Sequence, residues 1–188
     1  MNVGKNGSKL ILLVVWMPFM LACLYLEGLI QVPEPKMETN IDTVIEVLKG
    51  EDWIPLQSLA SETYTEADYA KPGTLTYTVN VNAANDKPLY FNYGWCAKDE
   101  QILRQNFEHI NVQVYFNKAE LGSDVVHNLS YGSADGLVCL DFGVLLSEWP
   151  AGEYFLKAVV TFDEKINDGI ADYEPGDYVF EYNVRVAE

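Results

Sequence analysis

The sequence predicts an all-β fold in which about seven strands form two antiparallel sheets that pack face to face. In several segments apolar and polar residues alternate with a period of two, which is typical of strands that bury one face. Strands and helices do not alternate regularly along the chain, so a parallel sheet with crossover helices is not expected. The chain contains 12 tyrosines, whose broad rings pack well on a pleated surface.

The strands are placed from the apolar residues that share one face. The pattern is cleanest at residues 75–81, where apolar and polar side chains alternate at every position. The segment 125–130 is the weakest and is expected at a sheet edge, and a short helix is expected where the alternation breaks between residues 97 and 109. Together the strands are expected at residues 75–81, 89–95, 110–116, 125–130, 137–142, 154–162 and 178–186.

A corner motif precedes the sixth strand. Pro150 and Gly152 form a tight turn that leads into Tyr154. In this segment the sequence resembles the immunoglobulin and fibronectin type III superfamily, whose members carry a tyrosine corner at this place. The resemblance implies an immunoglobulin-like sandwich in which the Tyr154 hydroxyl bonds to backbone a few residues upstream. Leu156 stands where antibody-type domains have a cysteine, and the resemblance implies no activity.

The first 30 residues are expected to be a signal or anchor segment outside the folded domain. Residues 1–9 are polar and basic, and residues 10–26 form an unbroken apolar run. This pattern fits a cleaved signal peptide, a lipoprotein signal with Cys23 as the lipidated residue, or an uncleaved anchor. The basic residues on the N-terminal side predict a cytoplasmic N-terminus and an exported domain, extracellular or periplasmic, tethered to the membrane.

Residues 31–73 are expected to form a linker and a short helix that precede the sandwich at residues 74–188. Pro33 and Pro35 favour an extended spacer. Residues 41–48 carry apolar side chains at helical spacing, with Thr39 or Asn40 as the N-cap and Gly50 as the stop. The apolar stripe of this amphipathic helix is expected to dock on the sandwich; the alternative is a helix that binds a partner.

A disulfide is expected between Cys96 and Cys139. Cys23 lies in the leader, so these two cysteines remain as a pair in a domain that is expected to be exported. Cys139 lies in a predicted strand and Cys96 ends another. The alternative is a pair of buried free thiols.

The long acidic loop between the last two strands is a candidate calcium site. Calcium prefers several carboxylate and carbonyl oxygens supplied by a flexible loop. An EF-hand is excluded because Lys165 and Asp168 occupy positions that would need an oxygen ligand and a glycine. The alternative is a solvated hairpin loop without a cofactor. The candidate ligands are Asp163, Asn167, Asp168, Asp172, Glu174 and Asp177.

The sequence gives little support for catalysis, and we expect no enzyme activity. His109 and His127 are the only histidines, and their spacing matches no metal-binding motif. The Gly-Ser-Ala-Asp-Gly run at residues 132–136 lacks the order of a nucleophile elbow. A spatial pair of carboxylates, as in glycoside hydrolases, stays open as a distant alternative.

Composition and strand pattern predict a binding role. The net charge of −16 argues against nucleic-acid partners. We therefore expect a non-catalytic interaction module for a cell-envelope or surface protein, with a glycan-binding domain as the alternative. In the latter, Tyr90 or Trp149 would be exposed and would stack on sugar rings. The polar residues of such a platform would be Thr76, Thr78, Asn80, Asn111, Gln113, Tyr115 and Asn183.

Overall fold

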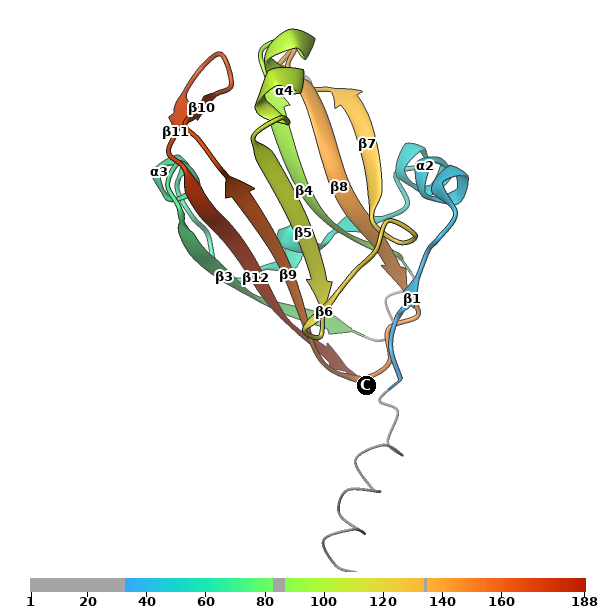
Figure 1. Ribbon diagram of the computed structural model, residues 1–188. Coiled ribbons are helices and arrows are strands. Elements are labelled where there is room, and N and C mark those ends of the chain that lie inside the picture. Colours follow the sequence, from blue (N-terminus) through green and yellow to red (C-terminus); the bar gives the residue numbers. More distant parts are fainter. Residues whose placement is uncertain (1–32, 83–86, 134) are drawn as a thin grey trace, which may run out of the picture. The chain divides into compact units, whose positions relative to one another are not determined.

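The computed structural model describes residues 33–82, 87–133 and 135–188 (Figure 1). The compact unit from Pro35 to Glu188 is mostly β-structure. The predicted signal or anchor segment at residues 1–30, with the lipidation candidate Cys23, lies outside the described residues. In the part of the chain that is described, no helix is both long and apolar enough to span a bilayer.

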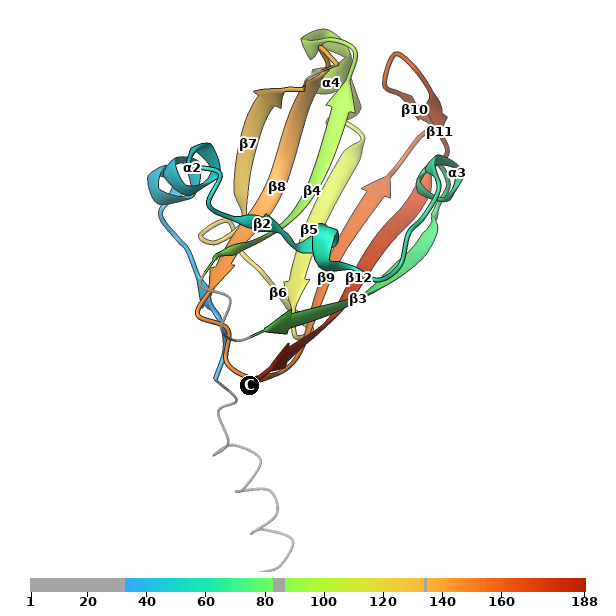
Figure 2. The same ribbon diagram turned by 180° about the vertical axis from the view of Figure 1, so that it is seen from behind.

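Two five-stranded sheets make up the unit, and we name each after its central strand (Figure 2). The β9 sheet has the order β3 (Gly73–Asn82), β12 (Gly176–Ala187), β9 (Gly152–Phe162), β5 (Ile110–Phe116) and β6 (Ala119–Glu120). The β8 sheet has the order β1 (Lys36–Met37), β8 (Val138–Ser147), β4 (Leu89–Ala97) and β2 (Ile54–Pro55), and β7 (His127–Gly132) also pairs with β8.

The expectation of purely antiparallel sheets needs correction at two pairs of strands. β3 pairs in parallel with β12, and β2 pairs in parallel with β4. Neither pair is joined by a hairpin, which would force the antiparallel direction. Between β2 and β3 the chain instead passes through a 3₁₀ helix, Leu56–Leu59, and the short helix α3, Glu66–Tyr69. This segment leads the chain from the β8 sheet to the edge of the β9 sheet, where β3 pairs with the last strand, β12.

The two sheets share one hydrophobic core. Tyr182 of β12 stacks on Tyr77 of β3, with ring centroids 4.5 Å apart, and contacts Phe91 of the opposite sheet at 5.2 Å. A second cluster closes one end of the core, where Trp95 contacts Phe162. This end also holds α4 (Glu100–Asn106) and the small hairpin of β10 (Ile166–Asn167) and β11 (Asp172–Tyr173).

Helix α2 (Ile41–Lys49) docks on the outer face of the β8 sheet. Asn40 is its N-cap, and the Asn40 side chain accepts a hydrogen bond from the backbone N–H of Asp42 at 2.9 Å. Val44 is fully buried against Tyr90 and Leu145. The prediction of an amphipathic helix that docks on the sheets is confirmed. The predicted exposure of Tyr90 is wrong, because the helix covers this ring and leaves it 2% exposed.

The corner before β9 contains the hydrogen bond that the resemblance implies. The Tyr154 hydroxyl donates to the Pro150 carbonyl oxygen at 2.9 Å, and the phenol ring lies against Gly152. Trp149 contacts the Tyr154 ring edge-on at 5.2 Å and is only 9% exposed. The predicted exposure of Trp149 is therefore wrong, because this indole belongs to the core.

We expect Tyr154→Phe to lower the free energy of unfolding by about 1–2 kcal/mol, since it removes one hydrogen bond from a buried site and leaves the Pro150 carbonyl unpaired. Urea unfolding followed by circular dichroism measures this change. Tyr115→Phe is the matched control, because the Tyr115 ring lies on the outer face of the β9 sheet. An equal loss in both variants would contradict a special role for the corner.

Candidate binding face

The outer face of the β9 sheet gathers polar side chains from four strands. On β3 the alternate residues Tyr77 and Val79 are buried in the core, so Thr78 and its equivalents point outward. The same alternation holds on β12, β9 and β5. We call this surface the outer polar face; it comprises Thr76, Thr78, Asn80, Glu181, Asn183, Arg185, Glu153, Phe155, Lys157, Asn111, Gln113 and Tyr115.

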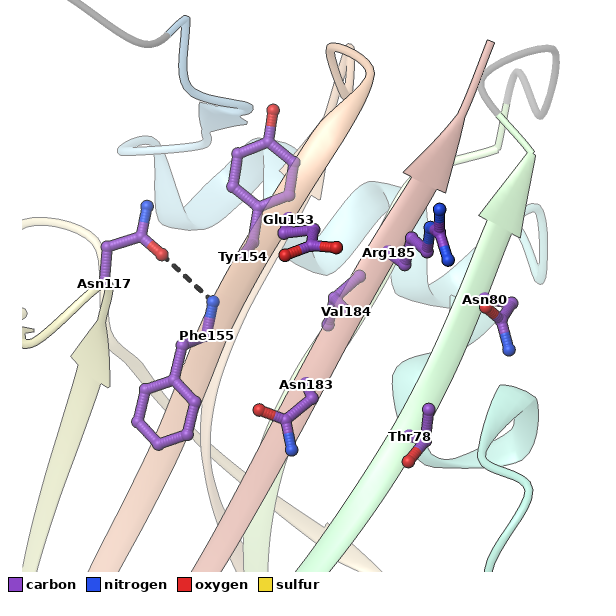
Figure 3. Close-up of a pocket in the computed structure, with 9 residues that line it drawn as sticks. All are labelled: Thr78, Asn80, Asn117, Glu153, Tyr154, Phe155, Asn183, Val184 and Arg185. Atoms are coloured by element: carbon purple, nitrogen blue, oxygen red, sulfur yellow. Dashed lines mark hydrogen bonds between the residues drawn. The ribbon is translucent and has the colours of Figure 1, made fainter.

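One end of this face is hollowed into a pocket of about 450 Å³ (Figure 3). Strand register builds its rows: Asn183 lies between Thr78 and Phe155, and Arg185 lies between Asn80 and Glu153. The side chains of Tyr154 and Val184 are buried on the opposite side of the sheet, so these two residues contribute to the floor. The lining consists of Thr78, Asn80, Asn117, Glu153, Tyr154, Phe155, Asn183, Val184 and Arg185.

Asn117 forms a fixed wall of the pocket. Its side-chain oxygen accepts a hydrogen bond from the backbone N–H of Phe155 at 3.0 Å, and its own N–H donates to the Phe155 carbonyl at 2.7 Å. Asn117 and Lys118 have positive φ angles of 46° and 75°, which make a tight turn after β5. Asparagine tolerates this conformation better than most residues. The turn therefore holds the backbone that carries the Phe155 ring.

The pocket is balanced in charge although the chain as a whole is strongly acidic. Arg185 and Glu153 are direct neighbours across β12 and β9 and carry opposite charges. The other polar side chains in the lining are amides and a hydroxyl. In the adjoining row the Lys157 ammonium lies 4.4 Å from the centroid of the Tyr115 ring. The pocket lining therefore presents hydrogen-bonding groups and carries no net formal charge.

The outer edge of β3 is not open to another strand. The Thr78 backbone donates to the Glu62 carboxylate at 2.5 Å, and its carbonyl accepts from the Ser61 N–H at 3.0 Å. The Tyr64 hydroxyl donates to the Thr76 carbonyl at 2.7 Å. The hydrogen bond from the Thr78 backbone N–H is the main cause that holds the pKa of Glu62 below its usual value. A ligand can reach this side of the sheet across its face rather than along its edge.

Sequence reasoning identified part of this site. It named Thr78, Asn80 and Asn183 as members of a polar strand face. It missed Glu153, Phe155, Arg185 and Asn117, because the register that brings β9, β12 and the turn after β5 together is set by pairings distant in sequence. The alternation along residues 152–162 would have placed Glu153 and Phe155 on the outer face.

The predicted calcium ligands do not converge on a common centre. Asp168 accepts hydrogen bonds from the backbone N–H groups of Ile170 and Ala171 and from the Tyr173 hydroxyl. Asn167 bonds to Asp172, and Lys165 forms ion pairs with Asp172 and Glu174.

The remaining two candidates lie in separate contacts. Asp163 contacts His109, and Asp177 accepts a hydrogen bond from Thr161. Across the described residues, no group of three or more His, Cys, Asp or Glu is arranged to hold a metal ion. Four of the six side chains are therefore bonded within or beside the β10–β11 hairpin, and Asp163 and Asp177 are bonded elsewhere, to His109 and Thr161.

The predicted disulfide is confirmed. Cys96 and Cys139 are bonded, and they lie directly opposite each other on the adjacent strands β4 and β8. They face outward from the core, on the same side of the β8 sheet as Tyr90. The bond therefore joins neighbours within one sheet.

Asp141 is a buried carboxylate that the sequence patterns did not predict. Asp141 is 7% exposed, and one of its oxygens accepts a hydrogen bond from the Asn92 amide at 3.0 Å. The other oxygen has no hydrogen-bond partner among the described residues. Burial raises the pKa of Asp141 to about 6, against the lowering effect of Asn92. Its ionisation interacts electrostatically with Tyr90 and Tyr131, which raises the pKa of both phenols in addition to the larger effect of their own burial.

Two glycines make room for this cluster. A Cβ at Gly94 would collide with the Asp141 carboxylate, and a Cβ at Gly143 would collide with the Tyr90 ring. Glycine inside a strand marks such a close approach, and this signal was available in the sequence. Asp141 and Tyr90 are both buried, so this close packing contributes to the stability of the β8 sheet.

The two histidines occupy separate places in the fold. His109 lies beside the acidic loop, 2.9 Å from Asp163 and 3.3 Å from Glu164. His127 is buried, and its Nε2 lies 2.9 Å from the Glu38 carbonyl oxygen. Ser133 accepts a hydrogen bond from the Leu137 N–H in the turn between β7 and β8. His109, His127 and Ser133 are therefore each held by contacts within their own part of the fold and do not form one site.

Comparisons with known proteins give no family. No protein-family model and no curated protein matches the sequence. Among solved structures, the chain is similar to one described as the solution structure of amebosin, with 12% identity over 61% of this chain and 96% of that chain. The TM-score of 0.24 is too low to support an argument about fold or function.

Proposed function

We propose that this chain is a non-catalytic binding module with an immunoglobulin-like sandwich, exported and tethered to the membrane, which recognises a component of the cell envelope or a surface protein. The observation that carries the proposal is the outer polar face with its pocket. The tether and the export are proposed from the basic and apolar pattern of residues 1–26.

The strand order supports the immunoglobulin-like assignment. Of the long strands, β4, β8 and β7 are neighbours in one sheet, and β5, β9 and β12 are neighbours in the other. The same neighbours occur in immunoglobulin domains, as strands B, E and D and as strands C, F and G. The hydrogen bond from Tyr154 to Pro150 agrees with a tyrosine corner at the start of strand F. The parallel pairing of β3 with β12 brings the first long strand to the G side.

The face is better suited to binding than to chemistry. Its pocket is open on one side and is lined mainly by amide and hydroxyl groups and by two neighbouring residues of opposite charge, Arg185 and Glu153. The buried acid with a raised pKa, Asp141, lies in the other sheet. An acid whose pKa is raised by burial is a typical catalytic group, so the separation of Asp141 from the pocket favours recognition.

The proposal is tested by capture of envelope material on the full chain in mild detergent. We expect a component of the source cells' envelope to be retained by the wild type and by Gln101→Ala, which removes an exposed amide on α4, outside the outer polar face. We expect Asn183→Lys, which places a long charged side chain in the pocket, to abolish retention. Retention that survives Asn183→Lys would overturn the assignment of this face.

A further inference from the structure

We infer that the pocket on the outer polar face binds a neutral saccharide. This inference rests on the proposed function and narrows it, because it names the class of envelope ligand. Four properties of the pocket support it: its hydrogen-bonding groups, its charge balance, its single aromatic ring and its size.

The hydrogen-bonding groups match the hydroxyl groups of a sugar. Asn80, Asn117 and Asn183 each have an amide that both donates and accepts, and the Thr78 hydroxyl does the same. Sugar hydroxyls likewise both donate and accept, so one amide can serve two of them at once. In Figure 3 the side chains of Thr78, Asn80 and Asn183 are seen close together on the two adjacent strands β3 and β12.

The charge balance selects against ionic ligands. An acidic glycan would be repelled by a chain of net charge −16, and the pocket has only Arg185 to attract it. A cationic ligand would be repelled by the same arginine. The cross-strand neighbours Arg185 and Glu153 supply donors and acceptors of opposite charge, which can bond to adjacent hydroxyls without favouring either sign.

Phe155 supplies the apolar contact that a sugar ring needs. Its ring is half-buried in the lining, and Asn117 bonds to both the N–H and the carbonyl of the same residue. The electron-rich face of a phenyl ring attracts the weakly positive C–H groups of a pyranose. The backbone that carries the ring is held in place, and a phenyl side chain has only two rotatable χ angles, so little conformational freedom is lost on binding.

The size and the surroundings favour a saccharide over a protein. A volume of about 450 Å³ is within the range of small-ligand pockets. Protein interfaces rely on large apolar anchors, and the exposed large hydrophobic residues of the described chain, Ile41, Tyr131 and Ile170, all lie off this face. A protein partner would instead suit the edge of β5, where β6 pairs only with Tyr115 and Phe116.

The test uses the full chain in mild detergent on an array of neutral oligosaccharides built from glucose, galactose, mannose and N-acetylglucosamine, followed by calorimetric titration of the strongest binder. We expect Asn183→Ala and Phe155→Ala each to weaken binding about ten-fold, the effect of one lost contact of about 1.4 kcal/mol. Phe155→Tyr should retain binding because it keeps the aromatic face. Gln101→Ala is the matched control, because it removes an exposed amide on α4, outside the outer polar face, and it should bind as the wild type does.

Each outcome decides the inference. Binding that is lost in the two pocket variants and kept in both Phe155→Tyr and Gln101→Ala supports it. It is overturned if no neutral oligosaccharide binds, or if binding is equal in the wild type and Asn183→Ala. If envelope protein is still captured through the pocket while no sugar binds, the proposed function stands and the saccharide does not. If neither is bound, both proposals fail.

Discussion

Asp141→Asn is expected to stabilise the protein above pH 6 by up to about 3 kcal/mol. The carboxylate is buried, forms one hydrogen bond to Asn92, and forms no ion pair with a described residue. Burial raises its pKa from 3.8 to about 6, and a shift of one unit corresponds to about 1.4 kcal/mol. Asparagine keeps the acceptor for Asn92, has the same shape and removes the buried charge.

The sign follows from proton binding in the two states. Well below pH 3.8 the carboxyl is protonated both in the folded and in the unfolded chain, and the substitution changes little. Between pH 4 and 6 the unfolded chain releases the proton while the folded chain keeps it, so the free energy of unfolding of the wild type falls. Above pH 6 both states are ionised and the loss is complete. The advantage of Asp141→Asn should therefore grow from pH 4 to 6 and then level off.

Urea unfolding at pH 4, 5, 6 and 7.5 measures this difference, and thermal unfolding at pH 7.5 should show a rise in Tm of roughly 5–10 °C. Glu108→Gln is the control, because this acidic side chain is exposed. It should leave both stability and its pH dependence near those of the wild type. If Asp141→Asn instead lowered the free energy of unfolding by the same amount at every pH, ionisation of Asp141 would not be what destabilises the wild type.

The strands and α2 could be predicted because their patterns are local. Alternation with a period of two places Tyr77 and Val79 in the core whatever the strand pairs with. The helix follows from its cap at Asn40 and its apolar stripe, and both are sequence-adjacent features. The corner follows from a short motif, and its hydrogen bond from Tyr154 spans only four residues.

The exposure of aromatic residues could not be predicted, because it depends on what covers each outer face. Alternation correctly places Tyr90 on the outer face of the β8 sheet. It cannot show that α2 lies over that position, or that Trp53 contacts the ring at 5.5 Å. Asp141 lies on the same outer face and is also buried, which alternation alone does not show. This face is covered in part, and the pattern of a single strand does not distinguish its buried positions from its solvated ones.

The candidate site needed the pairing of distant strands. Asn183 and Thr78 are neighbours only because β12 pairs in parallel with β3, and no hairpin in the sequence specifies that pairing. In the acidic loop, composition does not show which groups the carboxylates bond to. The composition suggested a calcium site, but in the β10–β11 hairpin the carboxylate oxygens of Asp172 and Asp168 are bonded to Lys165 and to local backbone N–H groups.

Loss of the disulfide is expected to have the largest effect, a decrease of about 4 kcal/mol in the free energy of unfolding. Cys96 and Cys139 are 43 residues apart, and the bond restricts the unfolded chain by closing the loop between them. In the folded state β4 and β8 stay paired through their backbone ladder, so the native structure changes little. The cost arises mainly from the greater freedom of the unfolded chain.

The measurement compares urea unfolding of the wild type, the reduced wild type and the double variant Cys96→Ala with Cys139→Ala. Alanine is chosen because Cys139 is fully buried and a hydroxyl there would lack a partner. The reduced wild type and the double variant should be destabilised alike, which separates the lost bond from the lost sulfur atoms. Reductant should have no effect on the double variant, which serves as the control. Alkylation of both Cys96 and Cys139 in the unreduced, denatured wild type would contradict the bond itself, and equal stability with and without reductant would contradict its energetic role.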